Sequence, residues 1–287
     1  MLIYVGLLVS SIGHASWDNI LQWMIANDPD ASVLHMHWIR TLFMWVILLA
    51  ISRHTQLPPQ QWTWWFEFSF VGWTVPGIAY TTSVMLTGHR ISLSLQPFVP
   101  LLVCLSIGKE MTAVHLFSLT ISVLGSLAIW LNNPWSHHDV ELWMVWLSLL
   151  TATVHALALV RWFIMLDELK TNRIAAMARG VGLSVVTFFT LMIMWTPQHL
   201  MSTAMNRWDM WFLVIVASAL SVGCKYWVIA RCSAYMTTDA VATFECIRPI
   251  ATFCSDLLRG QDMFERMDIV TIILLIIGWI CYPKMNI

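Results

Sequence analysis

The chain has 287 residues, of which 59% are hydrophobic and 11% are charged, whereas ordinary soluble domains carry about 25% charged residues. The formal net charge of -1 excludes a broad basic surface for nucleic acid. The six cysteines form no C-x-x-C pair and most lie within apolar stretches, so we expect neither a metal centre nor a cofactor.

In chain order, ten apolar stretches follow one another with only short connections between them. A helix needs roughly 20 residues to cross the hydrocarbon core of a membrane, and these stretches have about that length. Every backbone polar group must be satisfied inside lipid, which favours helices. We therefore predict an all-α membrane protein with ten transmembrane helices. The predicted spans are 2–25, 33–52, 64–86, 91–108, 113–132, 141–163, 174–195, 209–231, 239–258 and 267–283.

The first span, 2–25, differs from a secretory signal. It lacks a basic start and a small-residue cleavage site, and it continues through Trp17 and Asp18. We expect it to remain in the protein as the first transmembrane helix.

A break near the middle of the chain divides it into two halves of five spans each. The halves are residues 1–132 and 141–287, joined by a connection at 133–140. His14 and His155, each followed by alanine, match between the halves. Because each half crosses an odd number of times, the second half enters the membrane upside down, an arrangement that many transporters use. We expect two inverted five-helix repeats.

Basic residues in the connections predict the orientation. If the N-terminus is cytoplasmic, the inside connections and the span ends next to them carry seven basic residues and the outside connections carry four, which agrees with the positive-inside rule. We expect an integral protein of the plasma (inner) membrane with both termini in the cytoplasm. The inside residues are Arg53, Lys109, Arg161, Lys170, Arg173, Arg231 and Lys284, and the outside ones are Arg90, Arg207, Arg259 and Arg266.

Four further cations, Arg40, Arg179, Lys225 and Arg248, fall inside predicted spans. One such residue at the middle of a membrane costs about 2.5–3.5 kcal/mol on insertion scales. These cations must therefore pair with acids or line a wet cavity, unless Arg40 and Arg179 extend to a nearby interface.

Central acids are fewer than central bases. Glu245 lies three residues before Arg248, so the two share a helical face and could pair, and Asp18 could neutralise one more base. A surplus of positive charge predicts a site for an anion, since a guanidinium binds carboxylate or phosphate through two parallel hydrogen bonds. We expect substrate contacts at Arg248, Lys225, Glu245, Arg40 and Arg179, the alternative being that these residues hold helices together.

His14 and Asp18 lie four residues apart on the first span and share a face. Such an intramembrane pair could carry a proton coupled to transport, or it could form a hydrogen bond between neighbouring helices. Trp17 between them suits stacking or cation–π contact with a substrate, or plain packing.

Three strings of residues carry a resemblance to a known family. They are Gly13-His14-Ala15-Ser16-Trp17-Asp18-Asn19, Ser92 to Pro100 leading to Gly108-Lys109-Glu110, and Val241-Ala242-Thr243 to Arg248-Pro249 with Ser255 and Gly260. In these strings the chain resembles the drug/metabolite transporter superfamily, in particular its EamA-like branch. It departs from that pattern at Asp18, which stands before Asn19, and at Gln261, where the family often carries a glutamate.

The resemblance implies ten helices in two five-helix halves and the movement of small organic molecules by alternating access. It also draws attention to Arg248, because triose-phosphate and nucleotide-sugar transporters have basic residues in the ninth helix where Arg248 stands.

We therefore expect a transporter of small organic metabolites with a central cavity near the bilayer midplane. An antiporter for organic phosphates or nucleotide-sugars is the alternative. A multi-pass membrane enzyme or a receptor fits less well, because the chain carries no common catalytic motif and its connections are short. The expected partners are the bilayer and an anionic small molecule, and we expect no nucleic acid. The sequence leaves open whether the chain forms a homodimer.

Overall fold

The computed structural model describes eight stretches of the chain. Within them every regular element is a helix, so the all-α prediction is confirmed. The predicted connection at 133–140 lies outside these stretches, as do the loop residues Arg53, Lys170, Arg207 and Lys284. The described stretches are residues 2–27, 33–52, 62–131, 141–169, 173–195, 208–219, 224–258 and 266–283.

The helices follow the predicted apolar spans in order. Those before the central connection are α1 (Leu2–Asn27), α2 (Val33–Ser52), α3 (Trp62–Ser69), a π-helical turn (Phe70–Thr74), α4 (Val75–Ser94), a 3-10 turn (Gln96–Phe98), α5 (Val99–Ser106) and α6 (Ala113–Leu131). Those after it are α7 (Leu142–Glu168), α8 (Arg173–Trp195), α9 (Trp208–Ala217), α10 (Cys224–Cys232), α11 (Thr238–Ala242), a 3-10 turn (Thr243–Cys246), α12 (Ile247–Leu258) and α13 (Arg266–Cys281).

Three helices of the described part are long and apolar enough to cross a membrane. They are Leu34–Ser52, Leu142–Glu168 and Arg173–Met194. Their length and composition are compatible with a membrane protein.

Four predicted spans, 64–86, 91–108, 209–231 and 239–258, differ from single straight helices. The span 64–86 is divided by the π-helical turn and continues to Ser94, with a kink at Gly88. Gly88 has a φ of 79°, a conformation that glycine adopts without steric cost. The span 209–231 holds two helices, α9 and α10. Apolar composition alone predicts the length of such a segment and not the breaks within it.

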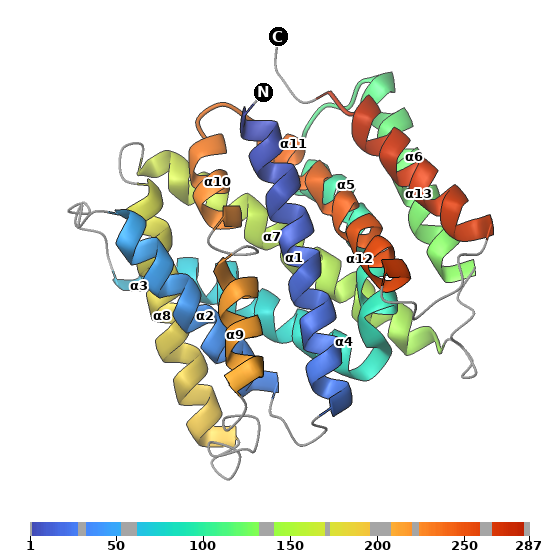
Figure 1. Cartoon of the computed structure of the whole chain (residues 1–287). Helices are drawn as coiled ribbons and strands as arrows, with labels where there is room; N and C mark the ends of the chain where they lie inside the picture. The colour runs from blue at the N-terminus through green and yellow to red at the C-terminus, as the bar shows by residue number, and fades with distance from the viewer. Residues whose placement is uncertain are drawn as a thin grey trace.

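The helices run back and forth between two ends of the molecule, and α1 begins at the end where α13 finishes (Figure 1). α2 packs on α8 and α6 packs on α13. At the centre, α7 packs against α4 and α5, while α1 packs against α10 and α12. Helices far apart in the sequence therefore surround a common interior.

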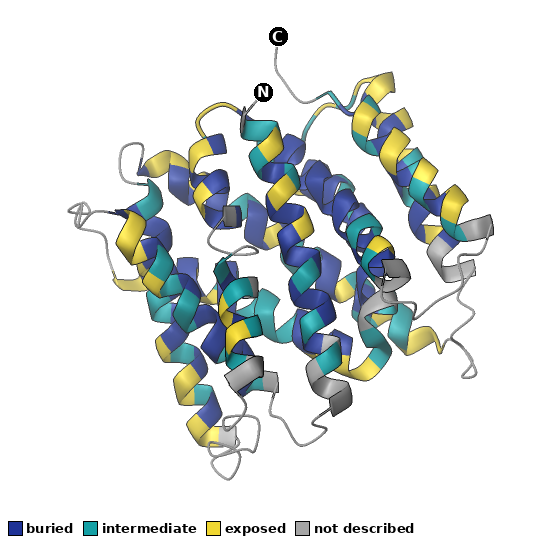
Figure 2. Ribbon diagram, in the orientation of Figure 1, coloured by how far each residue is buried: buried dark blue, intermediate teal, exposed yellow. Residues whose placement is uncertain are grey.

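Large apolar side chains cover much of the outside, where Figure 2 shows exposed residues along the outer faces of the helices. Met194, Trp62 and Leu142 are 76%, 72% and 71% exposed. In contrast, the charged side chains of Asp18 and Arg248 are buried. Soluble proteins show the opposite distribution, so the arrangement agrees with a lipid-facing surface.

Candidate functional site

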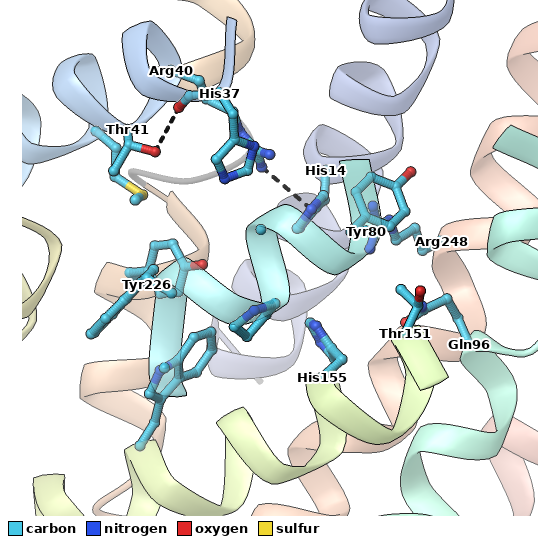
Figure 3. A pocket seen from close by; sticks show the side chains of 16 residues that line it. His14, His37, Arg40, Thr41, Tyr80, Gln96, Thr151, His155, Tyr226 and Arg248 are labelled. Carbon is cyan, nitrogen blue, oxygen red and sulfur yellow. Dashed lines mark hydrogen bonds between the residues drawn. The ribbon is translucent and has the colours of Figure 1, made fainter. Parts of the chain in front are cut away.

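A cavity of about 60 Å³ lies among the central helices, with room for a few water molecules. Most of its wall comes from α1, α2, α4, α7, α10 and α12. Figure 3 shows His14 pointing toward Arg40, with Tyr80 beside Arg248. Polar and aromatic side chains dominate the wall. They include His14, His37, Arg40, Trp73, Tyr80, Gln96, Thr151, His155, Trp162, Tyr226 and Arg248.

Arg248 on α12 forms a bidentate ion pair with Asp18 on α1. Its Nε donates to Oδ2 at 2.6 Å and its Nη2 donates to Oδ1 at 2.5 Å. The Tyr80 hydroxyl also donates to Oδ1 of Asp18, at 2.5 Å, and the guanidinium carbon lies 4.3 Å from the centre of the Tyr80 ring. Asp18 therefore neutralises the charge of Arg248.

Lys225 on α10 forms a second ion pair, with Glu245. Its Nζ donates to Oε1 of Glu245 at 2.7 Å, and both side chains are about 5% exposed. Nε2 of His155 lies 3.3 Å from the same oxygen. The possible pairing of Glu245 with Arg248 is not formed, because Asp18 on α1 binds the guanidinium and Lys225 binds Glu245.

Arg40 on α2 is the third central cation, and it is held differently. Its Nη2 lies 3.3 Å from Nε2 of His14 and its guanidinium carbon lies 4.5 Å from the centre of the Trp17 ring. Among the described residues, its Nε has no hydrogen-bond partner and no carboxylate forms an ion pair with it. Arg40 is only 5% exposed and lines the cavity, where no carboxylate of the described stretches serves as its counter-ion.

The imidazole of His14 stands between two cations. Nδ1 lies 3.3 Å from Nζ of Lys225, and Nε2 faces Arg40. A neutral imidazole has one acceptor nitrogen, so only one of the two contacts is a hydrogen bond at a time. His14 and Asp18 share a face of α1, as predicted, but they bind different partners.

The predicted site residues fall into two places. His14, Arg40 and Arg248 line the cavity, and Trp17, Asp18, Lys225 and Glu245 lie directly behind them. The structure does not bring Arg179 to this group. Arg179 is exposed, and its guanidinium lies 4.6 Å from the ring centre of Trp65 and 5.9 Å from that of Trp62.

Several residues of the cavity wall were not predicted from the sequence. Gln96 had a usable signal, because it stands four residues before Pro100 as Glu245 stands four residues before Pro249. Tyr80, Trp162 and Tyr226 carried no such signal, since aromatic residues are frequent throughout this chain. Among the described residues, no group of three His, Cys, Asp or Glu side chains is placed to hold a metal ion.

A second cavity of about 70 Å³ adjoins the first between α2, α4 and α8. The two cavities share His37 and Gly77. A Cβ on Gly77 would collide with the His37 ring, so only glycine permits this close approach.

Apart from the two ion pairs at the cavity, a further polar cluster lies at the end of the bundle where α5, α11 and α13 meet. Asp239, which is fully buried, accepts hydrogen bonds from Lys109 and from the Tyr282 hydroxyl, the latter at 2.5 Å. Cys104 Sγ lies 3.3 Å from the Tyr282 hydroxyl. Gly108, with a φ of 62°, ends α5 in a Schellman motif in which the Lys109 N–H donates to the Cys104 carbonyl at 3.0 Å.

No protein-family model matches the chain, and no curated protein matches it. The chain is similar to a solved structure described as "Crystal structure of protein", with a TM-score of 0.68 and 12% sequence identity. The alignment covers 95% of this chain and 96% of that one. At this identity the likeness shows a shared fold over nearly the whole length.

Proposed function

We propose that this chain is a membrane transporter that moves small organic molecules by alternating access. In this proposal the ten predicted spans cross the bilayer as two inverted five-helix halves, 1–132 and 141–287. Both termini lie in the cytoplasm, and the substrate binds in the cavity between the halves.

Helix packing supports the inverted repeat. Numbered by the predicted spans, α1 corresponds to α7, α2 to α8, α4 to α10, α5 to α12 and α6 to α13. The contact of α7 with α4 then has its counterpart in that of α1 with α10, and the contact of α7 with α5 in that of α1 with α12. When the two halves are exchanged, the contact between α2 and α8 is mapped onto itself, and so is the contact between α6 and α13. A two-fold axis relating the halves would produce this set of contacts.

Broken helices support a central site. A 3-10 turn (Gln96–Phe98) precedes α5, and another (Thr243–Cys246) precedes α12. The first turn brings Gln96 to the cavity wall, and the second brings Glu245 to Lys225. Transporters commonly interrupt corresponding helices of their two halves at the binding site.

The observation that carries the proposal is the set of charges around the cavity. Three cations and two carboxylates are at least 95% buried, and they come from α1, α2, α10, α12 and the 3-10 turn before α12. Replacing buried ion pairs by packed apolar residues is often neutral or stabilising. A fold built for stability alone does not need these charges, whereas a passage for a polar solute does.

The alternative, an antiporter for organic phosphates or nucleotide-sugars, depends on the basic residues Lys225 and Arg248. Both already have a carboxylate partner. We therefore favour a substrate of smaller charge.

The test is transport by the purified chain in lipid vesicles. Compounds that raise its melting temperature, as a ligand of the folded state does, would be tested for uptake. A carrier predicts saturable uptake that speeds up when the same compound is loaded inside. Binding without uptake would support a receptor instead, and uptake that never saturates would support a channel.

A further inference from the structure

We infer that the transported substrate is a monocarboxylate and that its carboxylate binds Arg40. This inference rests on the proposed function and names the class of molecule that the same cavity accepts. It assigns the principal substrate contact to Arg40 on α2, and it gives Arg248 the role of holding α12 to α1.

The charges around the cavity determine the charge of the ligand. With the histidines neutral, Asp18 balances Arg248 and Glu245 balances Lys225. Arg40 has no such partner among the described residues, so one positive charge is left over. A ligand with a single negative charge would bring the site to neutrality.

The geometry of Arg40 fits a carboxylate. Its Nε is buried and has no hydrogen-bond partner among the described residues, although it belongs to a residue of the cavity wall. A buried donor without a partner calls for an explanation such as a missing ligand. Nε and a neighbouring terminal nitrogen of a guanidinium together form a fork that matches the two oxygens of a carboxylate.

Further polar groups of the cavity wall, Nε1 of Trp73 among them, have no hydrogen-bond partner in the described part of the chain. Nε1 of Trp162 and Oε1 of Gln96 are buried and have no hydrogen-bond partner in the described part of the chain. Trp162 supplies a donor and the Gln96 amide can offer either a donor or an acceptor. Trp73 and Tyr226, which pack edge to face, give the same wall an apolar surface. The wall therefore suits a compact carboxylate with an apolar body and little further charge.

Other charge classes fit less well. A phosphate monoester carries about -1.5 to -2 charges at pH 7, so its binding would leave the buried site negative. An organic cation would add a second uncompensated positive charge beside Arg40. A neutral molecule would leave Arg40 without a counter-ion.

The test uses four molecules of similar shape and different charge. Thermal unfolding of the full chain in lipid nanodiscs would be followed with benzoate, phenyl phosphate, benzamide and benzylammonium, with butyrate as a smaller monocarboxylate and chloride as an inorganic anion. We expect benzoate or butyrate to raise the melting temperature most. The proposal is overturned if phenyl phosphate, benzylammonium or chloride stabilises the protein more than both monocarboxylates, or if neither monocarboxylate stabilises it.

Arg40→Gln tests the assigned contact. Losing a hydrogen bond to a charged group should weaken carboxylate binding by about 10- to 100-fold. The preference between benzoate and benzamide should shift toward benzamide, a change that a merely structural role of Arg40 would not produce. Arg179→Gln, which removes one charge from an exposed arginine outside the site, is the matched control and should bind as the unsubstituted chain does.

The outcomes separate this inference from the proposed function. Arg40-dependent binding of a monocarboxylate without uptake into vesicles would support the inference and overturn the transport proposal. Uptake of an organic phosphate or an organic cation that persists in Arg40→Gln would support the transport proposal and overturn the inference. Equal benzoate affinity in Arg40→Gln and in the unsubstituted chain removes Arg40 from the site.

Discussion

Asp18 and Arg248 lie 230 positions apart in the sequence and join the first helix to α12 through two parallel hydrogen bonds of 2.5 and 2.6 Å. The carboxylate is fully buried and the arginine is 2% exposed. The two opposite charges therefore compensate each other, which allows both side chains to be buried.

Arg248→Ala should lower the free energy of unfolding by about 3–5 kcal/mol, because it leaves Asp18 charged and unpaired in the interior. It should also abolish uptake into vesicles. Unfolding in detergent would measure the first effect. The double variant Asp18→Asn/Arg248→Gln leaves no lone charge and should recover most of the stability. Equal stability of the single and the double variant would contradict the ion-pair role.

Glu245→Gln should change which anions bind. It removes the counter-ion of Lys225, so two uncompensated positive charges then lie at or directly behind the cavity wall instead of one. We expect phenyl phosphate to gain affinity relative to benzoate by roughly tenfold, which corresponds to about 1.4 kcal/mol. Thermal shifts with the two compounds would measure the ratio. Glu168→Gln, at the far end of α7 where Glu168 bonds Trp64, is the control and should leave the ratio unchanged.

His14→Gln should remove any dependence of uptake on a proton gradient. The His14 ring lies between Arg40 and Lys225, so a proton on it is unfavourable until an anion arrives beside Arg40. Binding of an anion and of a proton should then favour each other. Uptake would be compared with and without an inward proton gradient at equal substrate concentration.

Other charged groups also surround His14. Arg248, which binds Asp18, and His155, which lies 3.3 Å from Glu245, both act on His14 electrostatically. Asp18→Asn is therefore expected to reduce stability and uptake at every pH, because Asp18 is the counter-ion of Arg248. A gradient response that survives in His14→Gln and disappears in Asp18→Asn would assign coupling to Asp18.

Asp239→Asn should destabilise the protein by about 1–3 kcal/mol, because it weakens a buried charged acceptor for Lys109 and Tyr282. Lys109→Gln should have a smaller effect, since the Lys109 side chain is 21% exposed and water can replace part of the contact. Unfolding of both variants would test this order, and an equal or larger loss for Lys109→Gln would contradict it.

The apolar composition was enough to predict where helices lie. Spans such as 33–52 and 174–195 closely match α2 and α8, because length and hydrophobicity alone decide whether a segment can be helical in lipid. The breaks were not predictable in this way. The divided span 209–231 has no proline at its break. The 3-10 turn at Thr243–Cys246 does have a local cause, because Pro249 lacks the N–H that would bond the Glu245 carbonyl.

Among the candidate site residues, the sequence indicated a surplus of central cations but not their partners. Which carboxylate meets Arg248 depends on how α1 and α12 are rotated toward each other, and a single sequence carries no record of that rotation. Arg179 illustrates the same limit. It lies among apolar residues like Arg40, yet the face of α8 that carries it points outward to Trp62 and Trp65.

The indole of Trp17 beneath Arg40 has a thermodynamic consequence for recognition. An arginine side chain has about 2 kcal/mol of rotamer entropy to lose when it is fixed. Stacking on a buried tryptophan fixes the guanidinium at 4.5 Å from the ring centre before any solute enters. The site is in this respect preorganised, and more of the attraction between the two opposite charges remains available as affinity.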